Sequence, residues 1–170
     1  MSHHPFHTYA QHVFVDTDLT YRLTPEPENA EYQACTVTIA DTLWRVRTAK
    51  ITPTKPGAFV ACWQRAADGT TEPFPADDRV HGLLVFVNEN QRSGVFQFTQ
   101  SHLEQLGVLS TPKQAGKRGF RLYPAWCTNL NPQATKTQAA QAPAFIDLTP
   151  PLTTTAQEQA LQTLLHNSHM

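Results

Sequence analysis

The chain has 170 residues, with 13 lysines and arginines against 14 acidic residues and a formal net charge of −1. This length suits a single domain with a buried core, and the near-neutral balance excludes a protein that attracts polyanions with its whole surface. No apolar run approaches the length needed to cross a membrane, so we expect no membrane insertion.

The start of the chain predicts a short helix. Apolar residues recur at helical spacing from Phe6 to Phe14, and Pro5 suits the first helical position. The first residues lack the basic and then apolar pattern of a secretory signal. Cys35, Cys62 and Cys127 are widely spaced and form no C-x-x-C pair, which favours reduced thiols in a cytoplasmic protein.

The next segments predict a series of strands. Residues 24–31 are polar and contain prolines, which is typical of a loop, and Cys35–Ile39 reads as a strand. A turn leads into a second strand that carries Arg45 and Arg47. The Pro-Thr-Lys-Pro-Gly turn at 53–57 then precedes a further apolar strand. Because this turn is short, we expect strands 45–50 and 58–64 to be adjacent and antiparallel.

The second half of the chain mixes strands and helices. Asp68-Gly69 is a hairpin signal, and Ser101 with Glu104 has the spacing of a helix-capping box. Residues 128–142 suit a polar helix or an ordered loop, and Thr155 with Glu158 predicts the cap of a final helix. Strands are expected at 83–87, 95–98 and 120–123. The pattern predicts an α+β fold, with a mixed, mostly antiparallel sheet of about five to seven strands flanked by helices.

Ten of the 13 lysines and arginines fall in two acid-free stretches, 45–65 and 113–136. If both stretches share one face, they form a positive surface for phosphates, and neighbouring aromatic rings can stack on bases. The alternative is that the cations are simply solvated and the aromatic rings belong to the core. The nucleic-acid-binding candidates are Arg45, Arg47, Lys50, Lys55, Arg65, Lys117, Arg118, Arg121 and Lys136.

Three longer motifs carry a resemblance to a known family. They are RTAKITPTKPGAFVACWQR at 47–65, Gly94-x-Phe96-x-Phe98, and GKRGFRLYPAW at 116–126. The sequence resembles the MepB family of bacterial proteins from about residue 28 to residue 148. The resemblance implies a single MepB-like domain, taken as 1–150, followed by a C-terminal helical extension at 151–170. The family often has Thr-Gln-Lys-Trp-Gln where this chain has Thr-Gln-Ala-Ala-Gln at 137–141.

The same resemblance implies a fold similar to PD-(D/E)XK, or restriction-endonuclease-like, enzymes, together with nucleic-acid binding. It also implies a cytoplasmic protein, encoded in some genomes beside a multidrug efflux pump and its regulator. Two alternatives to nucleic-acid binding stay open. One is a non-enzymatic protein-interaction module, accessory to a transcriptional regulator or efflux system, and the other is a site for a small phosphate compound. Whether the chain forms a homodimer is also open.

A metal-dependent nuclease needs two or three carboxylates around Mg²⁺ and usually a lysine near the attacking water. No Asp or Glu here is followed two residues later by Lys, and Thr48 stands where a carboxylate would precede Lys50. The catalytic candidates are therefore Glu31, Asp77 and Lys50, and the metal candidates Glu31, Asp77 and Asp78, on condition that they converge in space. Alternatively, Glu31 pairs with a neighbouring cation and the aspartates lie in a solvated loop. We expect cleavage to be lost, and Mg²⁺ to be bound only if cleavage persists.

Overall fold

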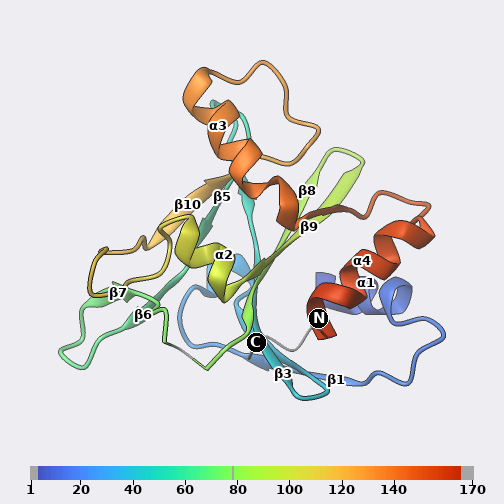
Figure 1. Ribbon diagram of the computed structural model, residues 1–170, viewed down its shortest axis with the longest axis horizontal. Helices are drawn as coiled ribbons and strands as arrows, with labels where there is room; N and C mark the ends of the chain where they lie inside the picture. Colours follow the sequence, from blue (N-terminus) through green and yellow to red (C-terminus); the bar gives the residue numbers. More distant parts are fainter. Residues whose placement is uncertain (1–3, 78, 166–170) are drawn as a thin grey trace.

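A computed structural model describes residues 4–77 and 79–165 (Figure 1). Its largest element is a six-stranded sheet in which only β3 and β8 pair in parallel, and the other neighbours are antiparallel. The predicted α+β class with a mixed, mostly antiparallel sheet is therefore confirmed. In spatial order the strands are β1 (Tyr21–Pro25), β2 (Cys35–Ile39), β3 (Thr42–Thr48), β8 (Gly82–Glu89), β9 (Arg92–Thr99) and β11 (Phe145–Asp147).

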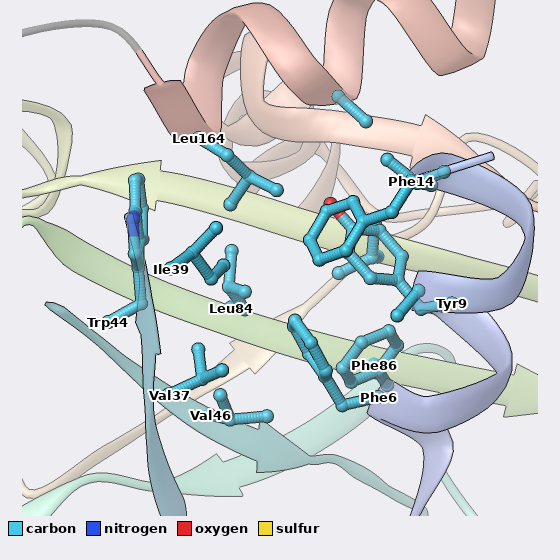
Figure 2. Packing of buried hydrophobic residues seen from close by; sticks show 14 of the residues in the cluster. Phe6, Tyr9, Phe14, Val37, Ile39, Trp44, Val46, Leu84, Phe86 and Leu164 are labelled. Atoms are coloured by element: carbon cyan, nitrogen blue, oxygen red, sulfur yellow. The ribbon is translucent and has the colours of Figure 1, made fainter. Parts of the chain in front are cut away.

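Two helices cover one face of this sheet, α1 (Pro5–Val13) and α4 (Thr154–Leu165), and they lie side by side in Figure 1. The predicted start of α1 is confirmed, because Pro5 is its first residue and the His4 side chain accepts a hydrogen bond from the Phe6 amide. Aromatic rings of α1 pack on the sheet around Phe86, and Leu164 of α4 completes the same core (Figure 2).

A smaller sheet covers the opposite face. It consists of β4 (Lys50–Ile51), β5 (Ala58–Ala61) and β10 (Gly119–Leu122), in the order β10-β5-β4. A second core of buried residues lies between the two sheets and includes Val60, Val85 and Leu122. Helix α2 (Gln100–Gln105) buries Leu103 in this core.

The remaining elements lie around the small sheet. Strands β6 (Trp63–Arg65) and β7 (Thr71–Pro73) form the hairpin that Asp68-Gly69 predicted. Helix α3 (Pro132–Gln141) runs beside β10 at the top of Figure 1, where the sequence had left a helix or a loop open. Two short 3-10 helices are η1 (Ala30–Tyr32) and η2 (Ala142–Ala144).

The expected pairing of residues 45–50 with residues 58–64 is wrong for most of its length. Strand β3 ends at Thr48, and the Ala49 amide donates to the carbonyl of Phe86 at 2.9 Å. Only the two residues of β4 then pair with β5, Lys50 with Phe59 and Ile51 with Ala58. The apolar strand β8 takes the free edge of β3, so the chain leaves one sheet and enters the other within two residues.

Local signals also misplaced some helix starts. Thr99, rather than Ser101, caps α2 by accepting a hydrogen bond from the His102 amide at 3.1 Å. Thr153, rather than Thr155, accepts the amide of Ala156 at the start of α4. Strand β1 occupies part of the stretch predicted as a loop, because the edge of β2 offers it a hydrogen-bonding partner.

Candidate nucleic-acid interface

Arg47, from the first basic stretch, lies inside the protein. Its side chain has 0% exposure and forms a bidentate ion pair with Glu26. The distances are 2.6 Å from Nη1 to Oε1 and 3.2 Å from Nη2 to Oε2. Nε donates to the carbonyl of Ala61, and Nη1 also donates to that of Val46. This removes Arg47 from the predicted phosphate-binding surface, because the small sheet covers the face of β3 from which its side chain projects.

Glu26 holds a second arginine of the same strand. The Nε of Arg45 lies 3.9 Å from Glu26 Oε2, and the guanidinium carbon sits 3.6 Å from the centre of the Phe74 ring. The Arg45 side chain is only 14% exposed. One carboxylate from upstream of the basic stretch therefore neutralises much of the charge that the sequence had placed on a surface.

Two further acids pair with exposed cations. Lys50 donates from Nζ to Glu31 Oε2 at 2.9 Å, and Arg65 donates from Nε to Glu28 Oε2 at 3.2 Å. The hydrogen bond from Lys50 and its charge hold the pKa of Glu31 below the usual range, and the same bond raises the pKa of Lys50. Over residues 4–77 and 79–165, Lys55 is the cation of the first stretch that forms no ion pair.

The catalytic candidates are brought together only in part. Glu31 and Lys50 form the ion pair described above, whereas Asp77 is exposed in a turn before β8. Asp78 lies outside the described residues. Among the residues that the structure describes, no three His, Cys, Asp or Glu side chains gather as a metal site would require. The catalytic candidates that do meet are Lys50 and Glu31, and the carboxylate of Glu31 balances the charge of Lys50.

The second basic stretch forms a groove of about 430 Å³ between β10, α3 and the end of α2. Lys117 lines it from the loop before β10, Arg121 from β10 itself, and Lys136 from α3. None of the described residues that line the groove is acidic. The other polar or aromatic residues of the lining are Gln105, Phe120, Tyr123, Gln133, Thr137 and Gln141.

Gln141 holds α3 against the free edge of β10. This side chain is buried, and it accepts a hydrogen bond from the Tyr123 amide at 3.0 Å while donating to the carbonyl of Arg121 at 2.8 Å. The helix begins at Pro132 because Asn131 caps it by accepting the Ala134 amide. Gln141 thus provides the hydrogen bonds that a further strand would have made, and α3 brings Lys136 to the groove that Lys117 also lines.

Arg121 connects the groove to the turn that carries Lys55. Its Nη2 donates to Thr52 Oγ1 at 2.6 Å and to the carbonyl of Pro56 at 3.0 Å. Arg118 instead points toward the β6–β7 hairpin, where its Nε donates to the carbonyl of Thr71 at 3.3 Å. The predicted continuous surface is therefore smaller than expected, and its members in the groove and on the turn are Lys55, Lys117, Arg121 and Lys136.

Sequence reasoning missed part of the groove. The Gln138 side chain donates to the carbonyls of Pro124 and Cys127 and so holds the loop after β10. Gln141 had no assigned role, and only the polar composition of residues 128–142 pointed to a helix here. Cys127 is half-buried, and burial, followed by the charge of Glu89, raises its thiol pKa, which disfavours a nucleophilic thiolate.

The comparisons with known proteins agree with the motifs. The MepB-like family matches residues 26–147, which include every residue of the groove. The chain belongs to the MepB-like family. A solved structure described as the crystal structure of MepB shares 32% sequence identity with this MepB-like chain and superposes with a TM-score of 0.75. That match covers 85% of this chain and 97% of the other.

No functionally curated protein matches this MepB-like sequence. Within the described ranges, none of its helices is both long and apolar enough to cross a bilayer. Family membership therefore accounts for the fold and the motifs, whereas the groove indicates which kind of ligand the chain can bind.

Proposed function

We propose that this MepB-like chain binds nucleic acid through the phosphate backbone, at the groove between β10 and α3. The observation that carries the proposal is that Lys117, Arg121 and Lys136 line one acid-free groove. Lysine and arginine supply most backbone contacts to nucleic acids, and amide and hydroxyl groups such as those of Gln133 and Thr137 add hydrogen bonds to phosphate. Lys55 extends the positive surface beyond the groove through the turn that Arg121 contacts.

Under this proposal the fold is an endonuclease-like one whose cleavage has been lost. Lys50, the residue best placed by sequence to assist an attacking water, is paired with Glu31. A single carboxylate beside a lysine holds a divalent cation poorly, because Mg²⁺ sites in nucleases draw on several oxygen ligands. We expect no cleavage of plasmid or oligonucleotide with Mg²⁺ or Mn²⁺. Metal-dependent cleavage that disappears in Glu31→Ala or Asp77→Ala would overturn this part of the proposal.

The experiment is a fluorescence-anisotropy titration of labelled single- and double-stranded oligonucleotides at several salt concentrations. Each phosphate contact contributes about −0.7 to −0.9 to the slope of log affinity against log salt concentration. The three groove cations therefore predict a slope of about −2.1 to −2.7. Replacing Lys136 with Ala should reduce this slope by about one contact and weaken all sequences alike.

The matched control is Lys113→Ala, which removes an exposed lysine of the same stretch that does not line the groove. It should change the slope much less than Lys136→Ala does. If no binding is seen at low salt, or if both variants weaken binding equally, the groove is not the interface. In that case the protein-interaction module, whose binding would resist salt, becomes the better explanation.

A further inference from the structure

A separate cavity of about 640 Å³ lies between α1 and the segment that leads into α4. Its inner wall contains the buried residues Tyr9 and Phe86, and Leu148, Pro151 and Leu152 also line it. This volume falls within the range of about 300–1,000 Å³ that is usual for small-molecule sites, which are mostly apolar with a few polar groups. We propose that the cavity binds a small, uncharged and largely apolar molecule, such as a two-ring aromatic compound.

The inner wall presents carbon rather than polar atoms. The Tyr9 hydroxyl donates to Gln97 Oε1, and Gln97 in turn donates to the carbonyl of Ala160 at 3.1 Å. The hydroxyl is therefore hydrogen-bonded inside the core. The Tyr9 ring packs edge to face with Phe86, with a centroid distance of 5.4 Å (Figure 2). These two rings are already buried, so an apolar ligand gains free energy mainly by removing the more exposed apolar lining, Val15, Leu148 and Leu152, from water.

The charge of the lining selects against ionic ligands. Among the residues that the structure describes, no Asp, Glu, Lys or Arg lines the cavity, although the imidazole of His12 does. A charged ligand would lose hydration on entry without gaining an opposite charge, which makes its transfer costly. The amides and hydroxyls of Gln11, Asn88 and Ser93 can still bond one neutral polar group of the ligand.

A polar bridge joins two of the elements that line the cavity. Gln157 of α4 donates from Nε2 to the carbonyls of Val13 and Val15, at 3.2 Å and 3.4 Å, and so ties α4 to the end of α1. Val15 lines the cavity with 48% of its surface exposed. A bound molecule would cover this apolar side chain, which the fold alone leaves in contact with water.

This cavity is built mainly by the two ends of the chain. Most of its lining comes from α1 and from residues 148–157, which lie outside the stretch that matches the MepB-like family. Phe86, Asn88 and Ser93 are its contributions from within that stretch. The site is thus distinct from the basic groove, and its ligand need not have any relation to nucleic acid.

The test uses the full-length protein and N-phenylnaphthylamine, an uncharged probe with one naphthyl and one phenyl group that fluoresces strongly only in apolar surroundings. We expect a saturable rise in fluorescence with one probe bound per chain. The sulfonated analogue, anilinonaphthalene sulfonate, has the same rings with a negative charge and should bind at least about tenfold more weakly, because no lysine or arginine lines the cavity. Equal or tighter binding of the sulfonate would overturn the assignment of an uncharged ligand.

Two matched pairs of variants locate the probe. Val15→Glu places a charge in the lining of the cavity and should weaken probe binding by about tenfold or more. Its control, Ile51→Glu, changes another exposed apolar residue that lies outside the cavity and should leave probe binding unchanged. Thr8→Trp fills the cavity from an exposed position of α1, and Thr135→Trp is its control on α3. All four positions are exposed, so the fold should be retained, and circular dichroism checks this.

Lys117→Ala should leave probe binding unchanged, so that failure of the groove and failure of the cavity can be told apart. No saturable fluorescence, or an equal loss of affinity in each variant and its control, would overturn the proposal for the cavity.

Discussion

The carboxylate of Glu26 binds the guanidinium of Arg47 through both oxygens, at 2.6 Å and 3.2 Å, where the arginine side chain has no exposed surface. An arginine that appears in the sequence as part of a basic rim is therefore one half of a buried ion pair. Removing one partner of such a pair leaves the other charge buried and uncompensated, and this is far more costly than losing a pair on the surface.

We accordingly expect Glu26→Gln to lower the free energy of unfolding by about 3–5 kcal/mol. Urea unfolding followed by circular dichroism measures the change. Glu28→Gln is the control, because its partner Arg65 is 53% exposed, and it should cost at most about 1 kcal/mol. Similar losses for the two variants would mean that the Glu26–Arg47 pair is not isolated from solvent.

Gln141 makes a second testable contribution, since it bonds both the Tyr123 amide and the Arg121 carbonyl. Gln141→Met keeps the approximate size of the side chain but leaves these two groups without partners, at about 1–3 kcal/mol for each buried group. We expect a loss of about 2–6 kcal/mol in the free energy of unfolding, together with weaker oligonucleotide binding because α3, which carries Lys136, is no longer held against β10.

Gln133→Met is the control for the stability part of this prediction, because Gln133 is an exposed residue of the same helix. Its unfolding free energy should stay within about 0.5 kcal/mol of the parent protein. A Gln141→Met variant as stable as Gln133→Met would show that water satisfies the freed groups of β10.

The Pro-Gly turn depends on Gly57 for two reasons. Its φ is +82°, and a Cβ built on it would lie 2.5 Å from the carbonyl oxygen of Leu122. Gly69 has a similar φ of +89° but nothing within 4 Å of its built Cβ. We expect Gly69→Ala to cost about 1–2 kcal/mol for its backbone conformation alone. Gly57→Ala should cost clearly more, because the backbone of β10 must also move, and thermal unfolding of the two variants makes the comparison.

The Glu31–Lys50 pair predicts a pH dependence of defined sign. The hydrogen bond and charge of Lys50 hold the pKa of Glu31 below its ordinary value. A lowered pKa in the folded state means that the contribution of the pair to stability is present above the unfolded pKa and is lost as the pH falls through the folded value. Carbon-detected NMR titration should find the Glu31 carboxyl titrating below the usual range, and Lys50→Met should restore it toward the ordinary value. An unchanged titration in that variant would mean that another group lowers the pKa.

Local patterns in the sequence were sufficient for several elements. Strand β2 was predicted with its observed ends at Cys35 and Ile39, since alternation places Cys35, Val37 and Ile39 on one buried face. The hairpin at Asp68-Gly69 and the proline start of α1 were also predictable, because turn and cap preferences depend on a few adjacent residues. The motifs that resemble the MepB family likewise identified the family.

The sequence also placed Lys117, Arg121 and Lys136 in one acid-free stretch, yet only the tertiary structure decided which cations reach a common surface. Arg47 and Arg121 have the same charge and both lie on strands, but the small sheet covers the first and leaves the second half-exposed beside α3. Glu26, Glu28 and Glu31 cancel much of the first stretch from 14 or more residues away in the chain. Charge pairing and burial depend on which strands become neighbours, and hydrophobic packing over the whole domain determines this.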